Sequence, residues 1–380
     1  MAVAVEGYCA PGYEKVATAF AANFATEGDV GGAVAVYRDG LPIIDLWAGI
    51  ADLSSQRPWT RDTIVGVFSI TKGLTTIAAH LLAQRGLLDL DAPVARYWPQ
   101  FAANGKAEIT VRMVMSHRAG LAHAPGTFTL DEALSWTPIV DALADAAPQW
   151  EPGTQHGYHM RTFGWLVGEI IRRVSGAPTP GTFFADEIAT PLGLSTWIGL
   201  PEQHDARCAT LIPPDFSVLD PATLPVPGTL RFDVATGPSG LFRYDEMWNT
   251  RRLRAAELPS SNAVTDARSL ARLYAACIGT VDGVRILDDR TVTRACEVQS
   301  IGPDMLLSRE SCFGVGFMRP PMLNTACGPR SFGHGGAGGS ASFADPDQRL
   351  GFGYVMNHMR LDEADPRVEH ITNALYECLD

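Results

Sequence analysis

The stretch Val67-Phe68-Ser69-Ile70-Thr71-Lys72-Gly73 places a serine and a lysine three residues apart, where a helical pattern from Ser69 to Gln84 begins. On a helix, positions i and i+3 share a face with Cβ atoms about 5–6 Å apart, so the amine should lie beside the hydroxyl. The helix N-terminus also offers free N–H groups and a dipole that stabilise negative charge. We therefore interpret Ser69 as a nucleophile and Lys72 as its base.

Lysine is scarce in this chain, which adds weight to Lys72. Of the 30 lysines and arginines, only Lys15, Lys72 and Lys106 are lysines. Lysine can lose its proton inside a protein, whereas arginine cannot. Burial among the apolar residues that precede Ser69 should lower the pKa of the lysine amine and make it a base.

The composition excludes several classes of partner. A net charge of −12 and a pI near 5.2 argue against nucleic acid and against an anionic membrane surface. No apolar stretch approaches 18 residues and the start lacks a signal-peptide pattern, so we expect no membrane span. Seven widely spaced cysteines favour reduced thiols in a cytoplasmic protein. The oligomeric state is not readable from these features.

The order of secondary-structure patterns predicts an α/β part plus an all-α part. An antiparallel sheet, flanked by terminal helices, is expected from residues 1–86 and 297–380. Residues 87–296 should form an inserted, mainly helical region, with the active site in the cleft between the two. The supporting patterns are helices at 11–27, 162–174, 266–277 and 367–379 and strands at 32–38, 41–50, 340–344 and 350–357, the first two strands being joined by an Asp-Gly turn.

Tyr158 ends a Pro/Gly-rich loop that begins at Trp150 and precedes the second of these helices. A phenol next to a cationic amine can become a proton shuttle, although a loop tyrosine is more often a packed aromatic. His156 and His159 form an H-x-x-H, but the spacing and nearby carboxylate of helical zinc sites are absent. We expect neither a metal nor an organic cofactor.

A glycine-rich run, residues 332–340, contains His334-Gly335-Gly336. Its glycines match the dinucleotide pattern G-x-G-x-x-G, yet a strand follows where that motif requires a helix. An α/β-hydrolase is also disfavoured, because the chain has no G-x-S-x-G nucleophile elbow. The alternatives that remain are a flexible turn and an edge strand whose backbone approaches a ligand closely and supplies an oxyanion-hole N–H.

The three elements and their order resemble the serine β-lactamase and penicillin-binding-protein superfamily, and more narrowly the class C-like family VIII carboxylesterases. Ser69-x-x-Lys72 comes early, Tyr158 midway, and His334-Gly335-Gly336 near the C-terminus. Flanking segments also match the family pattern, namely residues 115–121, 150–154, 164–176 and 332–346. The similarity therefore spans nearly the whole chain.

The resemblance implies a mechanism and a set of roles. Ser69 would attack an ester carbonyl and form an acyl-enzyme, Lys72 would be the base, and Tyr158 would relay the proton. The backbone N–H groups of Ser69 and Ala337 would form the oxyanion hole. Substrate contacts would come from Trp150, Met160, His334, Gly335 and Gly336, with the proline-rich loop 213–228 helping to shape the pocket.

Two departures from the family pattern favour a small neutral ester. Met160 stands where penicillin-binding proteins have asparagine, and His334 stands where they have a lysine that pairs with a carboxylate. We therefore predict a serine carboxylesterase for short or medium-chain or small neutral esters. The alternatives are an acyltransferase (transesterase), an amide or β-lactam hydrolase on the same scaffold, and a catalytically silent relative that binds a ligand.

Overall fold

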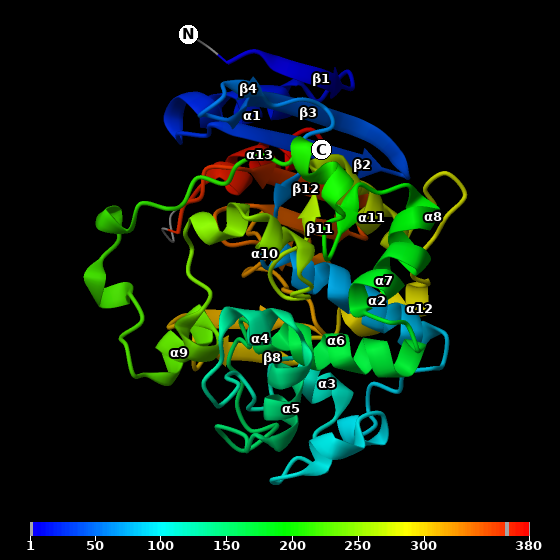
Figure 1. Ribbon diagram of the computed structural model, residues 1–380. Helices are drawn as coiled ribbons and strands as arrows, with labels where there is room; N and C mark the ends of the chain where they lie inside the picture. Colours follow the sequence, from blue (N-terminus) through cyan, green and yellow to red (C-terminus); the bar gives the residue numbers. More distant parts are fainter. Residues whose placement is uncertain (1–2, 362–364, 380) are drawn as a thin grey trace.

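A seven-stranded antiparallel sheet occupies the upper part of the computed structural model, which describes residues 3–361 and 365–379 (Figure 1). Its strand order is β1-β3-β2-β12-β11-β10, with β4 paired to β3. The bounds are β1 (Val5–Cys9), β2 (Gly31–Arg38), β3 (Leu41–Asp52), β4 (Arg57–Pro58), β10 (Phe332–Gly335), β11 (Ala341–Asp345) and β12 (Leu350–Met356). The pairing of β2 with β12 joins N-terminal and C-terminal strands, as the sequence predicted.

Alternation of side chains in β2 explains how helices cover both faces of this sheet. Val34 and Val36 face the cluster that contains helices α1 (Glu14–Thr26) and α13 (Arg367–Tyr376). Ala35 and Tyr37 face the cluster that contains helix α11 (Ala267–Ile278). The expected antiparallel sheet with flanking terminal helices is therefore confirmed.

The remaining elements lie mostly below the sheet in Figure 1. Helix α2 (Ile70–Gln84) crosses between the two regions and contacts both β10 and α6. Two small sheets are β5-β7-β6 and β8-β9, with bounds β5 (Val65–Gly66), β6 (Thr196–Trp197), β7 (Val264–Thr265), β8 (Ser300–Pro303) and β9 (Glu310–Phe313). The other helices are α3 (Val111–Met115), α4 (Leu130–Leu134), α5 (Thr137–Asp145), α6 (Thr162–Ser175), α7 (Pro180–Phe184), α8 (Thr190–Leu192), α9 (Leu230–Thr236), α10 (Arg251–Ala255) and α12 (Asp289–Ala295).

The sequence divides the chain into a sheet-containing part and an inserted helical part, with boundaries after residue 86 and before residue 297. Two elements pack against the part to which this division does not assign them. Helix α11, from the region expected to be inserted, packs against β2, β11 and β12. The β8-β9 hairpin lies among the helices in the lower half of Figure 1. We therefore propose a division in which α11 belongs to the sheet-containing part and β8-β9 to the helical part.

Strand β1 was not expected from the sequence. Its central residues, Glu6, Gly7 and Tyr8, are exposed, so the strand carries little of the apolar alternation by which strands are recognised. Within residues 3–361 and 365–379, no helix combines the length and apolar character needed to cross a membrane.

Candidate active site

Ser69 lies at the N-cap of α2, directly after a left-handed turn of the backbone. Phe68 has φ +45°, a conformation that non-glycine residues rarely adopt and that is often retained at functional sites. Thr71 fixes this turn, because its hydroxyl donates to the carbonyl of Phe68 at 2.5 Å and accepts from the N–H of Ala263 at 2.9 Å. The turn leads from β5 into the helix and sets the direction of the Ser69 side chain.

Lys72 is fully buried one helical turn further on. Its Nζ lies 3.1 Å from Oγ of Ser69 and donates to the carbonyl oxygen of Ser260 at 3.0 Å. Burial, reinforced by the positive charge of Arg161, lowers the pKa of the Lys72 amine well below its usual value. A neutral amine can donate to Ser260 and still accept the proton of the Ser69 hydroxyl.

Tyr158 lies against Lys72, with Nζ 4.8 Å from the ring centroid. Its ring stacks on Phe313 at 5.8 Å, and its backbone N–H donates to Oδ1 of Asp304 at 3.1 Å. Burial raises the pKa of the Tyr158 phenol, and the neighbouring Ser69 hydroxyl opposes that rise only partly. The phenol is therefore neutral, and among the described residues its hydroxyl has no hydrogen-bond partner.

Strand β10 brings His334 to the same place. The Tyr158 and His334 rings are 6.1 Å apart, and Nδ1 of His334 lies 2.7 Å from the carbonyl of Gly335, which assigns its proton to Nδ1. Burial and then the nearby Lys72 lower the pKa of His334 to about 3, so the imidazole is neutral. Its Nε2, an acceptor in this tautomer, is buried without a partner in the described part of the chain.

The turn after β10 lies directly against the segment that carries the serine. A Cβ on Gly336 would be 2.3 Å from the carbonyl oxygen of Val67, so only glycine fits. Neither the N–H of Ser69 nor that of Ala337 is hydrogen-bonded within the residues described. The close approach brings the two predicted oxyanion-hole segments together.

Helix α13 holds this turn from the other side. Arg367, which is fully buried, donates from Nη2 to the carbonyl of Gly338 at 2.6 Å and from Nη1 to Oδ1 of Asp29 at 2.7 Å. Asp365 supplies a second carboxylate at 2.7 Å. Residues from both ends of the chain thus fix the position of the turn.

Trp150 and Met160 pack in a small apolar cluster beside the loop that carries Tyr158, and Met160 also packs against the cluster that contains Tyr158. Trp150 packs with Ala122, Val234 and Leu306, and the half-buried Met160 lies at the edge of this cluster. The hydroxyl of Tyr244 lies 4.0 Å from Sδ of Met160. These contacts connect both residues to α9 and the segment after it.

The structure adds residues that sequence reasoning missed. Ser260 accepts from Lys72 across 188 positions of sequence, a relationship that no local pattern contains. Asp304 orients Tyr158 through its backbone, and His117 packs against the Tyr158 ring at 4.9 Å. Arg161 follows Tyr158 by three residues; its place next to Lys72 was not expected.

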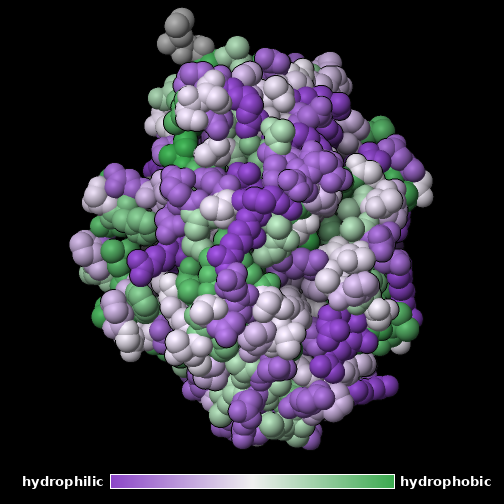
Figure 2. Space-filling model, viewed as in Figure 1, coloured by the Kyte–Doolittle hydropathy of each residue, from purple (hydrophilic) through white to green (hydrophobic). Residues whose placement is uncertain are grey.

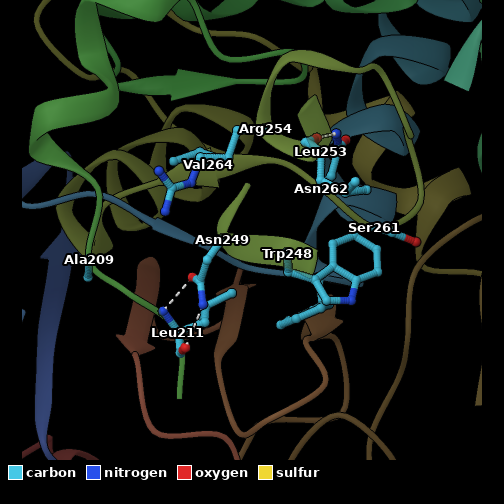
Figure 3. A pocket seen from close by; sticks show the side chains of 11 residues that line it. Ala209, Leu211, Trp248, Asn249, Leu253, Arg254, Ser261, Asn262 and Val264 are labelled. Atoms are coloured by element: carbon cyan, nitrogen blue, oxygen red, sulfur yellow. Dashed lines mark hydrogen bonds between the residues drawn. The ribbon is translucent and has the colours of Figure 1, made fainter. Parts of the chain in front are cut away.

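Two hollows of different size lie near Phe68. The smaller, about 20 Å³, is lined by residues that include Phe68, Trp248 and Ser261, and hydrogen bonds between Asn249 and the backbone of Leu211 close one wall (Figure 3). It has room for about one water molecule and not for an ester.

The larger hollow, about 830 Å³, lies beneath segment 216–245 and reaches Leu361. Figure 2 shows hydrophobic surface on the left, where Figure 1 places this segment and α9. Two contacts connect it to the site: Tyr244 packs edge-on to Phe68 at 5.4 Å, and Arg360, next to Leu361, pairs with Gly338. Its apolar lining consists mainly of Phe216, Val218, Leu219, Leu224, Pro225, Pro227, Phe232, Phe242 and Tyr244.

Histidines near the site are engaged in protein hydrogen bonds. His159 lies 2.6 Å from the carbonyl of Gly157 and accepts from the N–H of Leu121, while His156 lies 2.9 Å from the hydroxyl of Ser311. Among the described residues, no group of three or more His, Cys, Asp or Glu side chains is arranged to hold a metal ion.

Comparisons with known proteins agree on one family. The beta-lactamase family model matches residues 18–375. The esterase/beta-lactamase LipL of Mycobacterium tuberculosis is 38% identical over 370 residues, covering 93% of this chain and 83% of LipL. The crystal structure of a family VIII carboxylesterase is similar with a TM-score of 0.90 and 34% identity, covering 99% of this chain and 100% of the other. EstA from Arthrobacter nitroguajacolicus Rue61a is similar with a TM-score of 0.89 and 33% identity, covering 100% and 99%. The chain belongs to the beta-lactamase family.

Proposed function

We propose that this chain is a serine carboxylesterase that hydrolyses short or medium-chain or small neutral carboxylic esters through an acyl-enzyme on Ser69. The observation that carries the proposal is the 3.1 Å approach of the Lys72 amine to the Ser69 hydroxyl, with the amine buried and its pKa lowered. A buried neutral amine beside a hydroxyl is the pairing that nucleophilic acyl transfer requires. Membership of a family with esterase relatives supports it.

In the acylation step, the Ser69 oxygen bonds to the ester carbonyl carbon while the Ser69 proton passes to Lys72. The carbonyl oxygen becomes an oxyanion that the N–H groups of Ser69 and Ala337 stabilise. Removal of one such donor typically costs about 2.7–4 kcal/mol of transition-state stabilisation. Collapse of the intermediate breaks the bond to the alcohol, and Tyr158 conveys the Lys72 proton to the leaving alkoxide.

Deacylation repeats the sequence with water. The water oxygen attacks the acyl carbon as Tyr158 and Lys72 take its proton, and Ser69 leaves as the protonated hydroxyl. The Tyr158 hydroxyl, which has no hydrogen-bond partner in the described part of the chain, is available for both transfers.

The neutral state of His334 and the side chain of Met160 favour neutral substrates. His334 is uncharged because its pKa is lowered to about 3, so it offers no positive charge to a substrate carboxylate. Met160 offers no amide to hydrogen-bond an acylamino group. The large hollow under segment 216–245 would receive the apolar part of the ester.

A panel of nitrophenyl esters of increasing acyl length tests the proposal. We expect release of nitrophenol by the wild type and loss of that activity in Ser69→Ala. Labelling of Ser69 by a fluorophosphonate probe is an independent readout of the nucleophile. An inactive wild type, or an active Ser69→Ala variant, would contradict the proposal.

The cytoplasm is the location that we propose for this enzyme. All seven cysteines are free, as expected in a reducing compartment. Cell fractionation with an antibody to the chain would test it, and recovery in an exported fraction would contradict it.

A further inference from the structure

Arg161 is a buried arginine next to the proposed catalytic groups, and the mechanism above gives it no role. Its side chain is 3% exposed. Nη1 donates to the Ser261 hydroxyl at 3.1 Å, and Nη2 donates to the carbonyls of Ala235 and Phe242, each at 3.4 Å. All of these partners are neutral, so none of these contacts offsets the guanidinium charge with a negative one.

Three aromatic rings surround this charge. The guanidinium carbon lies 5.3 Å from the ring centroids of Tyr244 and Trp248 and 5.9 Å from that of Phe242. Aromatic faces attract a cation without neutralising it. Both Tyr244 and Trp248 also pack edge-on to Phe68, at 5.4 and 5.1 Å. The rings around Arg161 therefore contact the residue that precedes the nucleophile.

Ser260 connects Arg161 to Lys72. Its hydroxyl donates to the carbonyl of Arg161 at 2.9 Å, and its own carbonyl accepts from Nζ of Lys72 at 3.0 Å. The first of these bonds goes to the Arg161 backbone. The guanidinium holds the same segment through the Ser261 hydroxyl, one residue after the carbonyl that contacts Lys72, which places its charge near the lysine.

Among the other titratable groups around Lys72 the histidines are neutral, and one carboxylate, Asp304, acts on the Tyr158 phenol in the opposite sense to Arg161. Burial lowers the pKa of His117 and of His334, which keeps both rings neutral, and burial raises the pKa of Tyr158. Asp304 is the carboxylate associated with Tyr158, and it accepts from backbone N–H groups and from the Ser311 hydroxyl. Arg161 opposes protonation of Lys72 and also favours the ionised form of Tyr158.

We propose that Arg161 is a positioning residue whose positive charge, enclosed by aromatic rings, keeps Lys72 an unprotonated amine that is free to take the proton of Ser69, and eases release of the proton of Tyr158. This inference rests on the proposed function, because it concerns the same acyl transfer to Ser69. It explains why an arginine that makes no ion pair with a carboxylate of the described residues is held in the interior, where an unpaired charge is costly.

The pH dependence of kcat/KM for a nitrophenyl ester tests this role in Arg161→Met and Arg161→Lys. On the acid side of the profile, activity falls as Lys72 becomes protonated; we call this part the acid limb. Without the positive charge the Lys72 amine holds its proton to higher pH, so the midpoint of the acid limb of Arg161→Met should shift to higher pH by about one unit. That shift makes the variant about tenfold slower at any pH on the limb. Arg161→Lys keeps a charge there, and its limb should stay near that of the wild type.

The midpoint of the limb does not depend on how much of a variant folds, so partial misfolding leaves the readout intact. Arg173→Met is the matched control: Arg173 also lies over an aromatic ring, 5.5 Å from Trp98, but at the far end of α6. Its limb should coincide with that of the wild type. The rate of fluorophosphonate labelling against pH gives the same comparison without an ester.

Two results would overturn the inference: an unmoved limb in Arg161→Met, or an equal shift in Arg161→Lys. A wild type that neither hydrolyses esters nor reacts with the probe would instead overturn the proposed function, and this role would fall with it.

Discussion

The Nζ atom of Lys72 lies over the ring of Tyr158, 4.8 Å from its centroid, and contacts no carboxylate in the part of the chain that the structure describes. The ring face and the Ser260 carbonyl attract an ammonium only as neutral groups, and burial and the Arg161 charge outweigh them, so the pKa of the amine is lowered. This arrangement is typical of a lysine that acts as a base rather than of one that pairs with an anion.

Lys72→Arg should be as inactive as Lys72→Ala. Arginine fills the pocket with a charge but cannot give up its proton, so it cannot accept that of Ser69. Loss of a general base typically costs about 10²- to 10⁴-fold in rate. Steady-state kcat for a nitrophenyl ester checks this, and substantial activity in the arginine variant would contradict the role of Lys72 as base.

Tyr158→Phe should lower kcat by about 10²- to 10⁴-fold while KM and the melting temperature change little. The ring keeps its stacking on Phe313, and the hydroxyl that is removed has no hydrogen-bond partner among the described residues. Kinetics combined with thermal unfolding measure both effects. A large fall in melting temperature with an unchanged kcat would indicate a purely structural tyrosine.

Gly336→Ala should lower kcat by about 10²-fold, because a Cβ 2.3 Å from the Val67 carbonyl must push the two oxyanion-hole segments apart. Gly279→Ala, at the end of α11 and outside the site, is the control, since the nearest atom to its Cβ is the Ala275 carbonyl oxygen at 3.7 Å. The ratio of the two kcat values measures the effect. Equal activities would show that the close approach at Gly336 does not matter to the reaction.

Stability should fall as the pH drops below about 6.5. Burial lowers the pKa of His80 and His159 to about 4, that of His334 to about 3, and that of His117 as well. Between about pH 6.5 and 4 the unfolded chain binds protons that the folded chain does not. Each such histidine removes about 1.4 kcal/mol of stability per pH unit in that range.

Urea unfolding at pH 7, 6 and 5 measures this dependence. His80→Gln should flatten the slope by the contribution of one histidine, because His80 lies on α2 with its Nε2 2.8 Å from the Val315 carbonyl. An identical slope in the variant would contradict the assignment of His80 as a buried neutral ring.

Local patterns were enough to predict the elements that carry the site. The expected helix at 162–174 is Thr162–Ser175, and the Asp39-Gly40 hairpin turn has positive φ at both residues, as the type I′ turn requires. The proximity of Ser69 and Lys72 could be predicted because the spacing of residues on a helix alone determines the distance between them. These relationships need no knowledge of the rest of the fold.

Long-range relationships could not be read in the same way. Ser260 and Arg161 act on Lys72 only after segments 99 positions apart pack together. Helix α11 buries one face on the sheet, but its apolar spacing indicates only that some face is buried, not which partner covers it. Trp150 packs with Val234 of α9, and Met160 lies between this cluster and the one that contains Tyr158, which the loop sequence did not indicate.

The buried contacts among Asp29, Arg367 and Gly338 have a consequence for folding. The turn that carries Ala337 is held by α13, and Arg367 of that helix bonds a carboxylate 338 positions away in sequence. Contacts between segments so far apart carry a high loop-closure cost, and they slow folding. A folding chain in which Ser69 and Lys72 already share α2 therefore lacks a firmly held oxyanion turn until α13 has docked, so catalytic competence arrives only with the complete tertiary structure.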